Sequence, residues 1–115
     1  MQDFRKVDCW GKAHLLVLRV YRETDSMPPE EMFGMKLQLR RSAVSIPMKI
    51  AEGCGRDNNS DFQVDLRRAI ASCNELECLV VLAKDLELWA TSLSEELIGG
   101  AIEVRKMMLG LVKRL

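Results

Sequence analysis

The chain has 115 residues, of which 48% are hydrophobic, 30% are charged and 5% are aromatic. This length predicts a single domain spanning residues 1–115, and the Leu-, Val-, Ala- and Met-rich composition favours a helical bundle over a β-sandwich. The 17 basic and 17 acidic residues cancel, so the chain lacks the basic excess that a dedicated nucleic-acid-binding protein usually carries.

The sequence predicts neither a membrane span nor a signal peptide. No apolar run approaches the roughly 18 residues that a membrane-spanning helix needs. The first ten residues, MQDFRKVDCW, are charged and contain no apolar core. We therefore expect a cytoplasmic protein with no membrane partner.

The first predicted helix runs from about Cys9 to Thr24, with Asp8 as its N-cap. Apolar residues recur in it at steps of three and four, which predicts one buried face. That face contains Trp10, Ala13, Val17, Val20 and Tyr21. Pro28 and Pro29 end this helix and start the next, because proline suits the first position of a helix.

The second predicted helix runs from about Glu30 to Cys54 and has a wide apolar face. Two neighbouring lines form this face: Phe33, Leu37, Val44 and Ala51, and beside them Leu39, Ala43, Ile46 and Ile50. Pro47 cannot donate a hydrogen bond to the carbonyl four residues earlier, so we expect a bend there. Gly53 and Gly55 are expected to end the helix in a left-handed conformation.

Capping boxes predict the starts of the last two helices, because Ser is followed three residues later by Gln or Glu. Ser60 and Gln63 open the third helix, which runs to about Leu86, and Ser92 and Glu95 open the fourth, which runs to the end of the chain. The third helix has apolar residues at alternating steps of four and three: Phe62, Leu66, Ala69, Cys73, Leu76, Val80 and Ala83.

The fourth helix carries two apolar lines. The first contains Leu97, Ala101, Val104, Met108, Leu111 and Leu115, and the second contains Ile98, Ile102, Leu109 and Val112. Gly99 and Gly100 weaken the start of this helix, and we expect them to allow close approach of a neighbour. Because the predicted connections are short, successive helices should run antiparallel. The predicted fold is therefore all-α, an antiparallel up-down-up-down four-helix bundle.

Three groups of motifs give the chain a resemblance to a known family. They are QLRRSAVSIPMKIAEGCGR at residues 38–56, VDCW with KAH at 7–10 and 12–14, and SCNELE with LAKDL at 72–77 and 82–86. In these motifs, and over nearly its whole length, the chain resembles the four-helix-bundle proteins encoded in intervening sequences of bacterial 23S ribosomal RNA genes.

The resemblance implies a closed, barrel-like homopentamer of bundles, with no defined activity. More distant members of the same fold group are the accessory variability proteins of diversity-generating retroelements. For those proteins the resemblance implies binding to nucleic acid and to a reverse transcriptase. This chain departs from that pattern in its neutral net charge, which argues against strong nucleic-acid binding.

Arg40 and Arg41 are the most conspicuous candidates for contacts with phosphate groups. If the second and third helices are antiparallel, Arg40 lies near Glu75, with Glu77 one turn away. The favoured interpretation is therefore pairing of these arginines within the chain. A nucleic-acid contact and a subunit interface are the two alternatives.

Lys49, Arg56, Arg67 and Arg68 are predicted to gather near the turn between the second and third helices. A solvated or salt-bridged surface is the favoured interpretation, and a basic patch for nucleic acid or for a subunit interface is the alternative. Glu52 is expected to accept hydrogen bonds at a junction between helices.

No catalytic arrangement is recognisable in the sequence. His14 is the only histidine and cannot build the Glu-x-x-His pairs of a di-iron bundle. The four cysteines lack CxxC spacing and are predicted to be small buried apolar residues: Cys9, Cys54, Cys73 and Cys78. Greater exposure of Cys9 and Cys54, which lie near helix ends, is the alternative. We expect no metal, no cofactor and no enzymatic activity.

Three functional hypotheses follow. The first is a non-catalytic homo-oligomer that binds RNA or a ribonucleoprotein. The second is an accessory subunit of a reverse-transcribing element, and the position of the gene would distinguish the two. The third is an enzyme, which a stoichiometric metal in the purified protein would favour.

Overall fold

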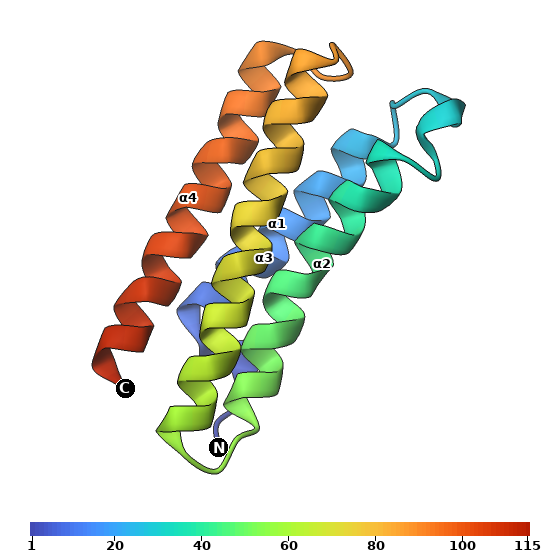
Figure 1. Ribbon diagram of the computed structural model, residues 1–115. Coiled ribbons are helices and arrows are strands. Elements are labelled where there is room, and N and C mark those ends of the chain that lie inside the picture. Colours follow the sequence, from blue (N-terminus) through green and yellow to red (C-terminus); the bar gives the residue numbers. More distant parts are fainter.

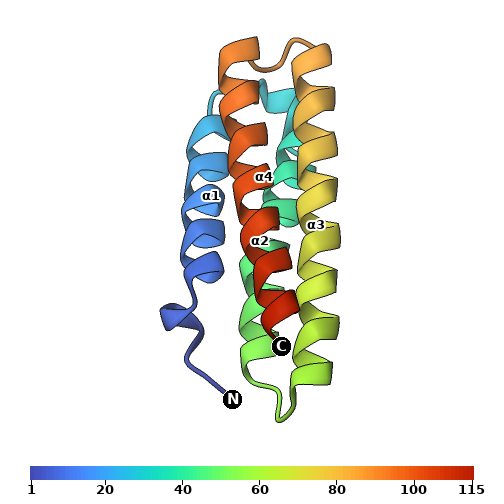
Figure 2. The ribbon, with the colours of Figure 1, turned by 90° about the vertical axis from the view of Figure 1, so that its left-hand side faces the viewer.

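Four α-helices joined by short turns make up the structure, a computed structural model that describes residues 1–115 (Figure 1). The helices are α1 (Asp8–Thr24), α2 (Met35–Cys54), α3 (Asn59–Asp85) and α4 (Thr91–Arg114). Two 3₁₀ turns, η1 (Phe4–Lys6) and η2 (Pro29–Glu31), precede α1 and α2. Successive helices run antiparallel (Figure 2), which confirms the predicted up-down-up-down four-helix bundle.

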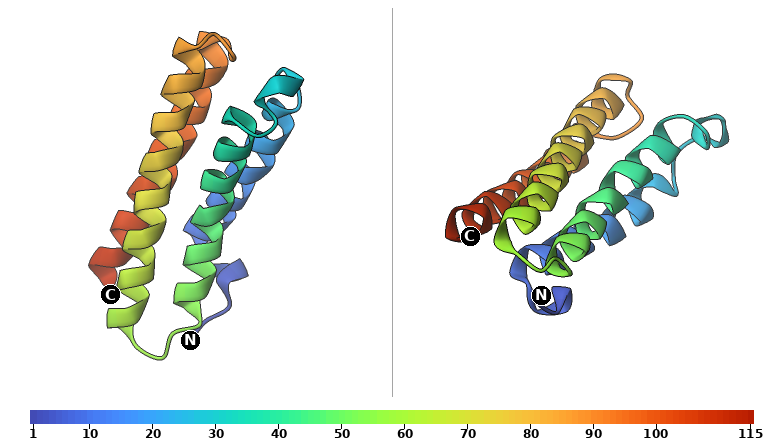
Figure 3. Two further views of the ribbon diagram at one scale, coloured as in Figure 1. Left: turned by 45° about the vertical axis from the view of Figure 1, so that its right-hand side comes forward. Right: turned by 60° about the horizontal axis from the view of Figure 1, so that its bottom comes forward.

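Each helix packs against its neighbours in the sequence, and α4 returns to lie beside α1. The diagonal pairs, α1 with α3 and α2 with α4, lie farther apart, with no Cα atoms within 8 Å of each other. The α2–α3 contact is the most extensive and the α1–α4 contact the least. Figure 3 shows the resulting arrangement, an α1–α2 hairpin and an α3–α4 hairpin joined by the α2–α3 turn, in a body of 44 × 22 × 19 Å.

The start of α2 lies later than predicted because the residues before it form a separate turn. Pro29–Glu31 make η2, and Glu31 Oε2 then accepts a hydrogen bond from Met35 N at 3.1 Å. This bond caps the first turn of α2. At α1 the predicted N-cap, Asp8, is instead the first helical residue, and Val7 occupies the capping position.

Both predicted capping boxes are wrong. Asn58, not Ser60, caps α3, because its Oδ1 accepts a hydrogen bond from Asp61 N at 2.8 Å. At α4 the capping position is Ala90, and no side chain, that of Ser92 included, caps the helix. Asn and Ser are equally good N-caps, so spacing alone could not choose between two candidates two residues apart.

One hydrophobic core runs along the bundle. All seven predicted core residues of α3 are buried, and so are the first four of α4. The second line of α2, Leu39 to Ile50, is fully buried. The buried face of α1 is rotated from the predicted one and contains Cys9, Ala13, Leu16, Val20 and Thr24.

Gly53 and Gly55 do not end α2 in the predicted way. No glycine has a positive φ, and Gly55 has φ −85° and ψ −4°. Gly53 is required for packing instead: a Cβ at this position would lie 2.6 Å from Cδ1 of Phe62 and 3.2 Å from Cβ of Asp65. The missing side chain lets α2 and α3 approach closely beside their connecting turn.

The other residues that weaken helices have different surroundings. Pro47 is buried inside α2, which continues beyond it, and the expected bend stays a prediction. A Cβ on Gly100 would lie 3.2 Å from Leu16 Cδ1, which agrees with close approach of α1 to α4, whereas a Cβ on Gly99 would meet nothing within 4 Å.

The only residue with a positive φ is Glu87, at 61°. It follows α3 in a Schellman motif, in which Leu88 N donates to the carbonyl of Ala83 and Glu87 N donates to that of Lys84, both at 2.9 Å. Glycine is the usual residue at this position because it has no Cβ. No pattern in the sequence points to this site.

Candidate functional site

Arg40 binds the end of α1 and not α3, so its predicted pairing with Glu75 or Glu77 is wrong. Its Nε donates to Thr24 Oγ1 at 2.8 Å, and its Nη2 donates to the carbonyl of Tyr21 at 3.0 Å and to Asp25 Oδ1 at 2.9 Å. Its guanidinium also lies 4.4 Å from the centre of the Tyr21 ring. A cation at the C-terminal end of a helix is favourable because the last carbonyls are unpaired.

The predicted antiparallel register of α2 against α3 is close to the observed one. The prediction was wrong about which side of α2 faces α3. Ser42 Oγ donates to the carbonyl of Ser72 at 3.2 Å, and Ser45 and Ser72 share a 2.8 Å hydrogen bond. These serines, and not the arginines, therefore lie on the side of α2 that meets α3.

Arg41 and Glu75 are both exposed and form no ion pair. Glu77 instead accepts a hydrogen bond from Arg105 of α4, which also donates to Asn74 Oδ1 at 3.0 Å. The hydrogen bond from Arg105 to Glu77 raises the pKa of the guanidinium above its usual range. The sequence interpretation compared only α2 with α3, so it did not identify Arg105 of α4 as the partner of Glu77.

Asp65 organises the turn between α2 and α3. Its side chain is 1% exposed, and it accepts a hydrogen bond from Arg56 Nε at 2.7 Å and a longer one from Arg56 Nη2 at 3.4 Å. Arg68 lies 3.6 Å from the same carboxylate. The Arg56 pKa is raised, first by its hydrogen bond to Asp65 and then by the carboxylate charge. Two of the four predicted basic-patch residues are therefore salt-bridged, as the favoured interpretation expected.

The remaining predicted residues near this turn have no partners. Arg67 is exposed and Lys49 is half-buried, and neither forms an ion pair. Glu52 is exposed, and its carboxylate accepts no hydrogen bond, so its predicted role at a helix junction is wrong; only its backbone carbonyl is used, by Gly55 N. Arg41, Lys49 and Arg67 are thus the predicted contact residues that remain free.

The first apolar line of α2 lies outside the core. We call Leu37, Val44 and Ala51 of α2, together with Phe33 in the turn before it, the outer line of α2. Phe33 is 85% exposed and Leu37 is 37% exposed, while the other two are half-buried. The second line of α4 lies partly in the core, because Val112 is buried and Ile98 packs against the core, whereas Ile102 is half-buried and Leu109 is 40% exposed. Phe33 and Leu37 at the start of α2 are therefore the members of these lines that are most exposed to solvent, together with Leu109.

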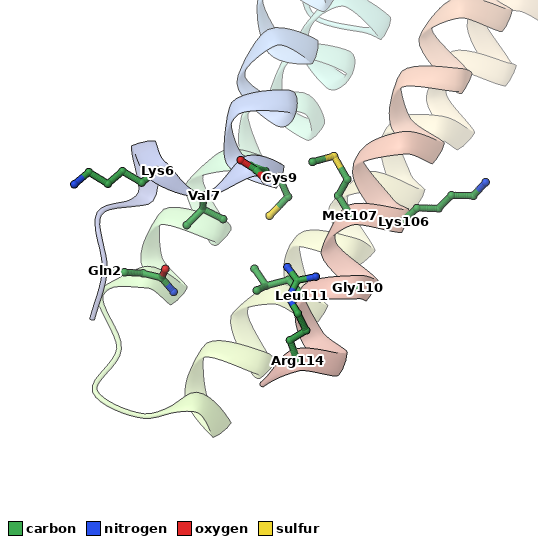
Figure 4. A pocket seen from close by; sticks show the side chains of 10 residues that line it. Gln2, Lys6, Val7, Cys9, Lys106, Met107, Gly110, Leu111 and Arg114 are labelled. Carbon is green, nitrogen blue, oxygen red and sulfur yellow. The ribbon is translucent and has the colours of Figure 1, made fainter.

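A cavity of about 540 Å³ opens between the N-terminal segment and the last turns of α4 (Figure 4). Its walls are apolar, formed by Val7, Cys9, Met107 and Leu111, and its cations are Lys6, Lys106 and Arg114. Burial raises the pKa of the Cys9 thiol to about 11, so this wall is uncharged. In Figure 4 the Arg114 side chain lies beside Leu111 across the cavity, and the two lysines extend outward from either side. We call this site the end pocket.

Three features concern metal binding, the cysteines and membrane-spanning helices. No three His, Cys, Asp and Glu side chains gather in a way that would hold a metal ion. Three of the four cysteines are buried, and only Cys78 is exposed, which corrects the prediction for that residue. None of the helices is both long and apolar enough to cross a membrane.

Comparison with known proteins gives both fold and family. The fold matches the crystal structure of a protein of unknown function from the S23 ribosomal protein family of Bacteroides thetaiotaomicron VPI-5482, with a TM-score of 0.82. The two sequences are 23% identical, and the match covers 91% of this chain and 98% of that one. No curated protein matches this chain. A family profile described as "23S rRNA-intervening sequence protein" matches residues 5–110. Since this match spans nearly the whole bundle, the chain belongs to the 23S rRNA-intervening sequence protein family.

Proposed function

We propose that the protein is a non-catalytic, homo-oligomeric helical bundle that binds RNA or a ribonucleoprotein. The observation that carries the oligomer is the outer line of α2, in which Phe33 is 85% exposed and Leu37 is 37% exposed. A contiguous exposed apolar surface usually marks an interaction site. Phe33 and Leu37 line one surface pocket together with Met32, so the exposed apolar side chains are contiguous at the start of α2.

Burial of this surface in a subunit interface would stabilise the oligomer. A large apolar side chain that is fully buried contributes about 1.5–3 kcal/mol. Phe33 and Leu37 together therefore offer a few kcal/mol per subunit, and a closed ring gains the same contact at every interface. We propose five subunits, the number that the resemblance to the family implies.

Light scattering coupled to size exclusion tests the oligomer. The chain has a mass of 13.1 kDa, and we expect a species of five such chains at micromolar concentration. Leu37→Ser should lower the mass, whereas Val64→Ser, a matched loss of an exposed apolar residue on α3 (48% exposed), should not. A monomeric wild-type protein would refute this part of the proposal.

The RNA-binding part is supported by the family and by the free cations Arg41, Lys49 and Arg67. Arginines that contact phosphates release counterions, so we expect binding that weakens steeply as salt rises. The assay is an electrophoretic shift with fragments of 23S ribosomal RNA at low salt. Arg41→Ala should weaken binding, whereas Arg68→Ala removes an equal charge that already lies beside Asp65 and should change binding less. No shift with any fragment would remove RNA from the proposal.

The alternative is an accessory protein that binds nucleic acid and a reverse transcriptase in a diversity-generating retroelement. A gene beside a reverse transcriptase, and retention of that enzyme by the tagged protein, would favour this alternative. A gene inside a 23S ribosomal RNA gene would argue against it.

A further inference from the structure

Two buried cysteines lie at the end of the bundle that holds the N-terminus (Figure 1). Cys9 belongs to the first turn of α1, and Cys54 is the last residue of α2. The two residues are 3% and 2% exposed, and both are free thiols. Cys73 donates a hydrogen bond to the carbonyl of Ala101 at 3.1 Å, whereas the thiols of Cys9 and Cys54 donate none. The fold therefore gives neither thiol of this pair a polar role.

The packing of α1 against α2 places these two cysteines in one layer of the core. The hydrogen bond from Arg40 Nε to Thr24 Oγ1, at 2.8 Å, fixes the antiparallel register at the opposite end of the two helices. Continued from there, this register pairs the buried residues in successive layers: Thr24 with Leu39, Val20 with Ala43, Leu16 with Pro47, Ala13 with Ile50, and Cys9 with Cys54. Gln2 N also donates to the carbonyl of Cys54 at 2.9 Å, so the segment that leads into α1 is anchored at this last layer.

The electrostatics of the two thiols agree with this placement. Burial raises the pKa of the Cys9 thiol to about 11, and the charge of Cys54 is the second cause of that shift. Burial also raises the pKa of the Cys54 thiol. Because charge interactions weaken with distance, the effect of one thiol on the other indicates that the two sulfurs are near neighbours. Both thiols are uncharged at neutral pH, and uncharged thiols react slowly.

The end pocket gives a small molecule access to this layer. Cys9 lines the cavity of about 540 Å³, and its sulfur lies beside Val7 in Figure 4. Cys54 is not part of the lining, so a molecule that enters the cavity meets Cys9 first. This order suits a reaction that begins at Cys9 and is completed by Cys54.

We propose that Cys9 and Cys54 are a reversible oxidation site, at which hydrogen peroxide converts the two thiols into a disulfide between α1 and α2. The thiolate form of Cys9 attacks one peroxide oxygen, so that an S–O bond forms, the O–O bond breaks, and the departing hydroxide takes up the Cys9 proton as water. The Cys54 sulfur then attacks the Cys9 sulfur, the S–S bond forms, the S–O bond breaks, and the second hydroxide leaves as water with the Cys54 proton. The sulfurs lose two electrons, the peroxide gains them, and a dithiol reductant reverses the change.

The disulfide would join the first turn of α1 to the last turn of α2. The closed loop would contain residues 9–54, which include nearly all of α1 and α2. A cross-link over a loop of this length restricts the unfolded chain and lowers its entropy. Oxidation should therefore hold α1 against α2 and make the bundle harder to unfold. This effect depends neither on the oligomer nor on RNA binding.

The test uses a Cys73→Ser/Cys78→Ser variant, in which Cys9 and Cys54 are the only thiols. The new hydroxyl at position 73 can still donate to the carbonyl of Ala101. The folded protein is treated with hydrogen peroxide, the peroxide is removed, and free thiols are counted with a thiol reagent in urea. We expect both thiols to be lost, the mass to fall by that of two hydrogen atoms, and the protein to run as single chains on a denaturing gel without reductant. Dithiothreitol should restore both thiols.

Removing Cys9 from the same background supplies the matched control. Cys9→Ser leaves Cys54 alone, so peroxide should form no disulfide within the chain, and circular dichroism checks that this variant is folded. Urea unfolding at one protein concentration should show an unfolding equilibrium constant at least about 10-fold smaller for the oxidised form than for the reduced form. The proposal is overturned if both thiols survive peroxide, or if they are lost with a gain of oxygen atoms in the mass. It is equally overturned if the disulfide forms only between chains or only in urea, or if the oxidised form is the less stable one.

Discussion

Replacing Gly53 by alanine tests whether the close α2–α3 contact determines stability. Two opposing effects act at this position. Alanine favours a helix over glycine by about 1 kcal/mol. The new Cβ, however, would lie 2.6 Å from Phe62 Cδ1 and 3.0 Å from Cε1, about 1 Å closer than the optimum for two carbons.

The steric effect should dominate. The Phe62 ring is buried in the core, and a Cβ on Gly53 would also lie 3.2 Å from Asp65 Cβ, so the ring must move against packed neighbours. Overpacking of a core costs about 1–3 kcal/mol, and more where the backbone has to shift. Because the new Cβ meets both a buried ring and a neighbouring Cβ, we place this cost at about 2–3 kcal/mol. After the helix gain of about 1 kcal/mol, we expect Gly53→Ala to lower the free energy of unfolding by about 1–2 kcal/mol.

Gly99→Ala is the matched control, because a Cβ there would meet nothing within 4 Å. This variant should be up to about 1 kcal/mol more stable than wild type. Urea unfolding followed by circular dichroism measures both, at one protein concentration because assembly also stabilises the fold. In a Phe62→Leu background the cost of Gly53→Ala should shrink by about 0.5 kcal/mol or more. A Gly53→Ala protein as stable as wild type would refute the packing argument.

Four further predictions concern other parts of the bundle. Arg56→Ala should destabilise the protein more than Asp65→Asn in urea unfolding, because it leaves a carboxylate that is 1% exposed with only the more distant Arg68; the reverse order would contradict this account of the turn. Glu87→Gly should raise the unfolding free energy by about 0.5–1 kcal/mol, since φ is 61° and glycine adopts that conformation without a Cβ clash; a loss of stability would contradict it. A thiol reagent should label Cys78 in the folded protein and leave Cys73 unlabelled. Burial raises the pKa of the Cys73 thiol from 9.0 to about 11, so its contribution to stability is complete below pH 9 and should be lost as the pH rises towards 11, which thermal unfolding across that range measures.

The helices and most of the core follow from local rules, and the contacts of polar side chains do not. Apolar residues at alternating steps of four and three predicted the α3 core correctly because they form one continuous line along that helix. On α1 the same rule predicted Ala13 and Val20 correctly. It chose Trp10 and Val17 where Cys9 and Leu16 are buried, because both residues of each adjacent pair are apolar. Arg40 shows the deeper reason for the missed contacts. The position of Arg40 along the helix axis was predictable from an antiparallel register. Which side of α2 faces α1, however, depends on the packing of all four helices.

The contacts between neighbouring helices differ in extent, and this difference determines where the bundle opens locally. The α2–α3 contact is extensive and joins neighbours in the sequence, whereas the contact of α1 with α4 is the least extensive and closes the bundle across the whole chain. Local opening should therefore begin with release of α1 from α4, and the backbone amides of α1 should exchange with deuterium well before those in the middle of α2 and α3. The α2–α3 hairpin would then be the last unit to unfold and the first to form, because its contacts require the shortest loop to close.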